Sequence, residues 1–234
     1  MKTKVLFSLA TMVTASLLAA ESAPKDQVMN AAKKLSDQPS YSWRSTVVVP
    51  DDAPFKPGPT EGKIEKGGFT WVSLSMMDNK IEAVTKENKG AIKQDGAWKS
   101  LEDIDKQEGF ERMPAVIVRG IKTPAAEASE LASAAKELKA DGEVISGDLT
   151  DEAAKKLQKF GPPDGEGPTV SDAKGSVKFW IKDGALVKYE FTLKGKISFN
   201  GNDMPNDRTT TVEIKEVGTT KLEVPEAARK EISR

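Results

Sequence analysis

The residues that decide the fold of this chain are Val187-Lys188-Tyr189-Glu190-Phe191-Thr192-Leu193-Lys194. Large apolar residues alternate there with charged or hydroxyl residues, as in a β-strand with one buried and one solvated face. The turn Asp183-Gly184 precedes this stretch, and a second strand-like segment, residues 175–182, precedes the turn. Asp-Gly is a preferred sequence for a two-residue hairpin turn. We therefore expect a long antiparallel hairpin over residues 175–199, with Val187 and Phe191 facing the interior.

Further strand patterns lie on both sides of this hairpin. They cover residues 41–49, 62–77, 81–93, 97–99, 143–147 and 209–217. Within residues 62–77, Ile64, Val72 and Leu74 share one parity, whereas Phe69 and Trp71 share the other. Either both faces of this strand are covered, or a bulge near Gly67-Gly68 changes its side. Residues 50–59 contain four prolines and cannot sustain a ladder, so we expect a loop that acts as a flap over one edge.

Helical patterns occur at the start, in the middle and at the end of the chain. Residues 24–37 form an amphipathic pattern that begins at a proline, and a short helix follows Pro225. Thr123 and Thr150 are suitable N-caps for two central helices, of which the first is expected to end at Asp141-Gly142 and the second to span residues 151–160. Residues 162–168 read as a linker. This order of elements predicts an α+β fold, a curved antiparallel sheet with helices on one side.

The first twenty residues resemble an export signal. Lys2 and Lys4 precede an apolar, uncharged run over residues 5–20, and small residues precede Glu21. The run is shorter than the ~20 residues of a transmembrane helix, although a retained anchor is the alternative. We expect a signal peptide at residues 1–20 and a single domain at residues 21–234 with no transmembrane segment. The periplasm is the favoured destination, and extracellular release is left open.

Composition argues against an enzyme. The chain contains no histidine and no cysteine, so it lacks the commonest acid-base group near neutral pH, the commonest nitrogen metal ligand and the thiol nucleophile. We expect no cofactor and no bound metal, and the oxygen-rich residues 200–207 read as a plain turn rather than a calcium loop. The net charge of −1 and the mixed distribution of charge exclude the basic stripe that nucleic-acid binding requires.

Three stretches carry a resemblance to a known family. They are residues 88–98 (NKGAIKQDGAW), residues 184–190 (GALVKYE) and residues 212–225 (VEIKEVGTTKLEVP). Together with the order of elements, they resemble the LolA-like periplasmic lipoprotein-carrier superfamily. The resemblance implies an unclosed antiparallel half-barrel, with the N-terminal helix and a helical insert at about residues 123–161 packed on its concave side. It also implies an apolar cavity suited to acyl chains or other lipid. The chain departs from the carriers at residues 70–74 (TWVSL), where they place a basic residue near a proline.

Two functions remain open at this stage. In the first, the protein is an exported carrier that binds a lipid or another hydrophobic ligand in a cavity on the concave face. The predicted lining of that cavity consists of Trp43, Val47, Val72, Leu74, Phe179, Val187, Tyr189 and Phe191. In the second, the same fold has a filled core and serves as a non-enzymatic envelope interaction or sensor domain with a protein partner. The volume and polarity of the space between sheet and helices separate the two.

Overall fold

The computed structural model describes residues 22–53, 56–65, 67–76, 79–159, 168–199 and 202–234. Its helices are α1 (Pro24–Ser36), α2 (Leu101–Asp105), α3 (Met113–Gly120), α4 (Pro124–Ala134), α5 (Asp151–Gln158) and α6 (Glu226–Ile232), with a 3-10 turn η1 at Gly109–Arg112. Its strands are β1 (Ser40–Val48), β2 (Thr60–Glu65), β3 (Phe69–Met76), β4 (Asn79–Lys86), β5 (Lys89–Gln94), β6 (Ala97–Ser100), β7 (Lys139–Asp141), β8 (Val144–Asp148), β9 (Thr169–Lys182), β10 (Ala185–Phe199), β11 (Asn202–Pro205) and β12 (Arg208–Lys215).

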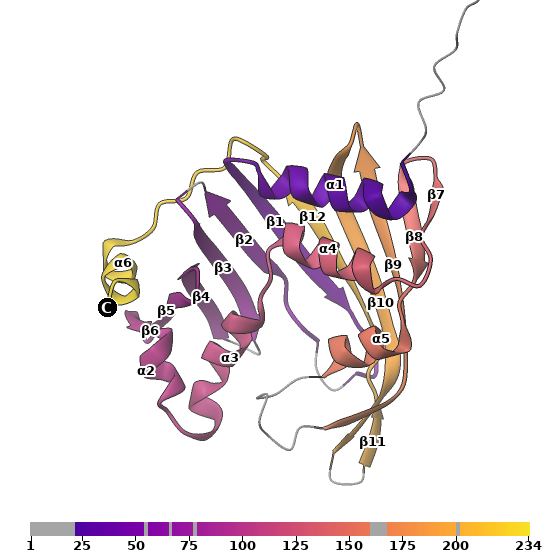
Figure 1. Ribbon diagram of the computed structural model, residues 1–234. Coiled ribbons are helices and arrows are strands. Elements are labelled where there is room, and N and C mark those ends of the chain that lie inside the picture. The colour runs from indigo at the N-terminus through magenta and orange to yellow at the C-terminus, as the bar shows by residue number, and fades with distance from the viewer. Residues whose placement is uncertain (1–21, 54–55, 66, 77–78, 160–167, 200–201) are drawn as a thin grey trace, which may run out of the picture.

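The strands form one antiparallel sheet that does not close. Its order is β6-β5-β4-β3-β2-β1-β12-β10-β9-β8-β7, and β11 pairs with β10 beside this path. The sheet curves around helices that lie on its concave side (Figure 1). The expected α+β class and the unclosed, curved antiparallel sheet are therefore confirmed.

The predicted hairpin of β9 and β10 is the longest strand pair. Asp183 and Gly184 form its turn with φ angles of +52° and +70°, the left-handed conformation that a tight hairpin of this type requires. The register then shifts between Leu186 and Lys188, so Val187 has no partner on β9. Val187 is 39% exposed, and the expectation that it faces the interior is wrong. The bulge adds one residue to β10, so the alternation of buried and exposed side chains shifts at this point. Leu186 is therefore buried in place of Val187.

Helices α1 and α4 cover one end of the concave face. Four residues of α1 are buried: Val28, Ala31, Ala32 and Leu35. On α4, Ala125, Ala128, Leu131 and Ala132 are buried, and the Thr123 hydroxyl accepts a hydrogen bond from the N–H of Ala126 as the expected N-cap. These residues share one apolar core with Phe179 and Tyr189 of the hairpin. Small side chains on both helices allow this close approach to the sheet. We call this region the packed end.

The central helix is shorter than its sequence suggests. Helix α4 ends at Ala134 rather than near Asp141, and Lys139–Asp141 form the edge strand β7. Backbone hydrogen bonds explain the change, because the N–H of Lys136 donates to Asp148 and the N–H of Thr150 donates to Ala134. These two contacts draw the chain after α4 into an extended path beside the start of α5.

The segment expected as one strand over residues 62–77 is two strands, β2 and β3. A turn at Gly68, with φ of +76°, separates them, so the proposed bulge is wrong. The alternative, in which both faces are covered, is confirmed for β3. Val72 and Leu74 lie in the main core, whereas Phe69 and Trp71 pack against a second core. That second core holds Val84, Ala91, Val224, Ala228 and Ile232, and it places α6 on the opposite face of the sheet.

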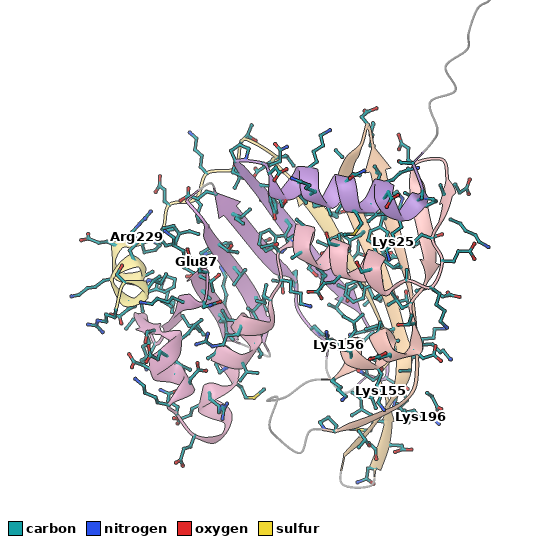
Figure 2. All side chains as sticks on the ribbon, in the orientation of Figure 1. Lys25, Glu87, Lys155, Lys156, Lys196 and Arg229 are labelled. Carbon is teal, nitrogen blue, oxygen red and sulfur yellow. The ribbon has the colours of Figure 1, made fainter. Side chains whose placement is uncertain are left out.

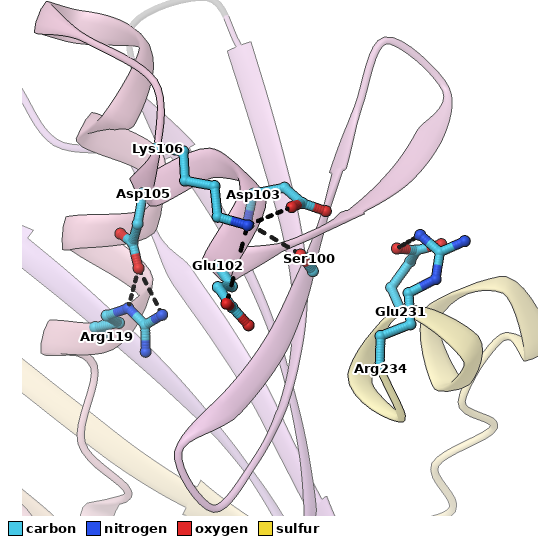
Figure 3. A network of polar contacts seen from close by, with 8 residues as sticks. All are labelled: Ser100, Glu102, Asp103, Asp105, Lys106, Arg119, Glu231 and Arg234. Atoms are coloured by element: carbon cyan, nitrogen blue, oxygen red, sulfur yellow. Dashed lines mark hydrogen bonds and ion pairs between the residues drawn. The ribbon is translucent and has the colours of Figure 1, made fainter.

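The region between β6 and α4 is compact and holds α2, η1 and α3, for which no element was predicted. Ser100 caps α2 by accepting a hydrogen bond from the N–H of Asp103 at 3.0 Å, and Arg119 of α3 pairs with Asp105 of α2 at 2.6 Å (Figure 3). Lys106 also lies near Glu102 and Asp103. Exposed ion pairs of this kind contribute little to the free energy of folding. They orient α2 and α3 relative to each other.

Several expectations concern residues outside the described ranges. They include the signal at residues 1–20, the centre of the proline-rich loop at residues 54–55, Phe160 and most of the linker. Within the described ranges, no helix has both the length and the apolar character needed to cross a membrane.

Candidate ligand-binding site

Six of the eight predicted cavity residues are buried in the main core: Trp43, Val72, Leu74, Phe179, Tyr189 and Phe191. They come from β1, β3, β9 and β10, so the sheet brings together residues that are far apart in the chain. Val47 lies further along β1 and is half-buried, and Val187 faces solvent. Whether these residues contact a ligand stays a prediction.

A polar contact crosses the packed end. The hydroxyl of Tyr189 donates to Glu127 Oε2 of α4 at 2.5 Å. Burial raises the pKa of both groups, and the neighbouring Glu127 carboxylate raises the pKa of Tyr189 further. Buried polar groups are costly without partners, and here each satisfies the other. The contact therefore fixes α4 to β10 in one position.

A pocket of about 500 Å³ lies between α4 and α5, and we call it the α4–α5 pocket. Its apolar wall is formed by Leu131, Ala134, Ala153 and Leu157. Its polar lining consists of Lys122, Glu127, Ser129, Glu130, Ser133 and Lys156, of which Lys122 and Glu130 form an ion pair. Most of the lining surface is apolar, so the pocket favours a hydrophobic occupant with polar groups at its rim.

A second pocket, of about 520 Å³, lies at the C-terminal end of α5, and we call it the α5–β11 pocket. Its apolar lining comes from the proline-rich loop and from β10 and β11: Val49, Pro50, Ala53, Pro57, Ile197, Met204 and Pro205. Its polar lining consists of Asp52, Gln158, Lys159, Asn206, Asp207 and Arg208. The proline-rich loop thus borders a pocket, although the sequence did not indicate which one.

Helix α5 contributes to both pockets. The Thr150 hydroxyl accepts a hydrogen bond from the N–H of Ala153 at 3.2 Å, as the sequence predicts for an N-cap. The first turn is acidic and the last turn carries Lys155 and Lys156, an arrangement that complements the helix dipole. Lys155, Lys156 and Lys196 lie around this helix and the neighbouring part of β10 (Figure 2).

Gln158 anchors the end of α5 against β10. Its Nε2 donates to the carbonyl of Lys194 at 2.9 Å, and its Oε1 accepts from Asn206 at 3.2 Å. Gly195 lies directly opposite, where an added Cβ would approach Gln158 Oε1 to 2.8 Å. A side chain at this position would therefore displace the Gln158 amide, whereas glycine leaves room for it. We call the region around α5 and its two pockets the hollowed end.

Val72 is the one predicted residue that lines a described pocket. That pocket is smaller, about 250 Å³, and lies between β3, β4 and α3. Polar groups from Thr70, Thr85 and Glu87 surround it, so it suits an apolar chain poorly. The residues that line the two larger pockets were not among the predicted site residues.

The described part of the chain contains no cluster of three or more acidic side chains that could hold a metal ion. Within the loop considered for calcium, Asp207 Oδ1 accepts a hydrogen bond from the N–H of Gly195 at 3.1 Å, and Asn206 donates to Gln158. Both side chains thus support the local backbone and the helix end.

Comparison with known proteins identifies structures of related shape but no family. No family model matches the chain, and no curated protein matches it. The chain is similar to LprF from Mycobacterium bovis, with a TM-score of 0.45 and 13% identity over 88% of this chain and 97% of that one. It is also similar to the lipoprotein LppX of Mycobacterium tuberculosis, with a TM-score of 0.45 and 10% identity over 86% of this chain and 98% of that one. Similarity at this level decides nothing about function, which has to be argued from the pockets themselves.

Proposed function

We propose that the protein binds a lipid or another acyl-chain ligand at the hollowed end, as an exported, non-enzymatic carrier of the cell envelope. One observation carries the proposal, the pair of largely apolar pockets of about 500 and 520 Å³ on α5. Small-molecule sites span about 300–1,000 Å³ and are lined mainly by apolar side chains with a few polar groups. Both pockets meet this description.

The ligand site of this proposal differs from the predicted one. Trp43, Phe179 and Tyr189 lie in the shared core beneath α1 and α4. In this proposal they pack behind the site and do not line it. The lining comes from α4, α5, the proline-rich loop and β11. The single domain at residues 21–234 and membership of the LolA-like superfamily belong to this proposal.

Binding can be tested with protein purified from its own envelope. Native mass spectrometry should detect a retained lipid as added mass, and the protein after lipid removal should bind an environment-sensitive apolar dye. The variant Ala153→Trp places a large ring in the α4–α5 pocket, so dye binding should weaken severalfold. Ala227→Trp, on the exposed side of α6, is the matched control. Unchanged dye binding in Ala153→Trp would show that the α4–α5 pocket does not bind the dye.

The packed end favours a second candidate function, a domain that binds an envelope protein partner. The buried cluster beneath α1 and α4 is continuous, which is what a filled core requires. Purified protein without any lipid, together with a wild-type chain that does not bind the dye, would support this candidate over the carrier.

Export is tested separately. N-terminal sequencing of the exported protein should start at or within a few residues of Glu21. Recovery of a chain that begins at Met1 from the membrane fraction would contradict the signal peptide and support a retained anchor.

A further inference from the structure

Arg208 holds an unusual position in the α5–β11 pocket. It begins β12, and its partner on β10 is Leu193, which is fully buried. Its Nη2 donates to the carbonyl of Leu157 at 2.6 Å, in the last turn of α5. Its surroundings are apolar enough that burial lowers the pKa of the guanidinium. A cation thus lies at the inner side of a largely apolar pocket.

Within the described ranges, the bond to Leu157 is the only hydrogen bond that the Arg208 guanidinium makes. Carbonyl groups in the last turn of a helix have no partner within the helix, and a cation is favourable there. An arginine has five N–H donors, and this contact uses one. Among the residues that the structure describes, no carboxylate lies within ion-pair distance of Arg208. Capping α5 alone therefore does not account for a half-buried guanidinium in a largely apolar pocket.

The two carboxylates in the lining of the pocket, Asp52 and Asp207, form no ion pair with Arg208. Asp207 Oδ1 accepts a hydrogen bond from the N–H of Gly195, and Asp52 lies on the exposed loop. Lys159, at the end of α5, adds a second cation to the lining. Burying a charge costs free energy unless a partner of opposite charge is present, and a ligand can supply that partner.

We propose that the α5–β11 pocket binds an acyl chain whose anionic head group, a carboxylate or a phosphate, pairs with Arg208. The acyl chain would lie against Ile197, Met204 and Pro50, while the guanidinium binds two oxygens of the head group. This inference rests on the proposed lipid-binding function and adds the class of ligand and the residue that selects it.

A matched pair of ligands tests the inference on the full chain after lipid removal. The fluorescent fatty acid cis-parinaric acid and its methyl ester have the same chain, and only the acid carries a charge. We expect the wild-type protein to bind the acid roughly tenfold or more tightly than the ester, as a charge-assisted hydrogen bond would give. Arg208→Gln keeps a donor for Leu157 but removes the charge, so it should bring the affinity for the acid down to that for the ester.

Two further variants keep the test decisive. Arg44→Gln removes an arginine that pairs with Glu61 away from both pockets and should keep the full preference for the acid. Arg208→Lys keeps the charge but loses the planar guanidinium, so a weaker preference for the acid should persist. This variant replaces Arg208→Gln in the test if Arg208→Gln does not fold. Equal binding of acid and ester by the wild-type chain, or an unchanged preference in a folded Arg208→Gln variant, would overturn the inference.

The outcomes also separate the inference from the function on which it rests. Binding of both ligands without preference would overturn the role of Arg208 and leave lipid binding intact. Binding of neither ligand would overturn both. Displacement of the bound acid by phosphatidylglycerol but not by palmitate would identify the head group as a phosphate, and the reverse would identify it as a carboxylate.

Discussion

The packed end and the hollowed end lie on the same face of one sheet, but their covering helices leave different amounts of space. At the packed end, α1 and α4 present small or aliphatic residues, such as Ala32 and Ala128, directly to the sheet. At the hollowed end, α5 has eight residues and buries only Ala154 and Gln158. Its end is held by a polar contact of Gln158 with β10. Helix length and residue size thus decide where the space beneath the helices is filled and where pockets remain.

The largest expected difference between the two ends is in stability. Phe179→Ala, at the packed end, removes a fully buried ring and should lower the free energy of unfolding by about 3–5 kcal/mol. Leu157→Ala, in the wall of the α4–α5 pocket, removes a side chain that already borders open space, so its cost should be clearly smaller. Urea unfolding followed by circular dichroism measures both. Equal losses would show that the hollowed end is as well packed as the other.

A second prediction concerns pH and the buried Glu127. Burial raises the pKa of this carboxyl above its ordinary value of 4.5, so the folded protein binds the proton more tightly than the unfolded chain does. The stability gained from this proton is fully present below the unfolded-state pKa and is lost as pH rises through the folded-state pKa. Glu127→Gln should therefore be more stable than the wild type at pH 7, and the difference should shrink as the pH falls toward 4.5.

Thermal unfolding at several pH values tests this prediction. Glu152→Gln removes an exposed carboxylate from the first turn of α5 and serves as the control, without the gain at neutral pH. A Glu127→Gln variant less stable than the wild type at pH 7 would mean that the hydrogen bond from Tyr189 outweighs the cost of burying the charge.

The smallest effect compares two equivalent helix caps. Thr123→Ala and Thr150→Ala each remove a side-chain hydrogen bond to the first turn of a helix, typically worth about 1 kcal/mol. Because α5 borders two pockets, Thr150→Ala should accelerate hydrogen exchange throughout α5. Because α4 is held by the core, Thr123→Ala should accelerate exchange only in the first turn of α4. Similar exchange profiles would mean that the two helices are held equally firmly.

Sequence patterns predicted the elements whose signals are local. The alternation around Tyr189, the turn at Asp183-Gly184 and the caps Thr123 and Thr150 all lie in the structure as expected. Val187 could not be placed in this way, because a bulge depends on the register of the partner strand rather than on the residue itself. Helix α2 had a usable signal, Ser100 three residues before Asp103, that was not recognised.

The pockets were beyond prediction for a different reason. Their lining joins α4, α5, a proline-rich loop and β11, and no single pattern in the sequence links these four segments. Apolar alternation identifies a core, and it therefore pointed to Phe179 and Phe191 rather than to the space beside them. Arg208 is one of 35 basic residues, and only the fold shows that it lies in a pocket.

The open sheet also bears on how the chain avoids self-association. The main path of the sheet ends at β6, with four residues, and at β7, with three. An exposed edge offers unpaired N–H and C=O groups to a neighbouring molecule, and short, charged edges limit such pairing. Strand β7 begins with Lys139 and ends with Asp141, and β6 passes directly into α2. The open sheet thus ends at both β6 and β7 in a short strand, which limits pairing with a neighbouring molecule at these two positions.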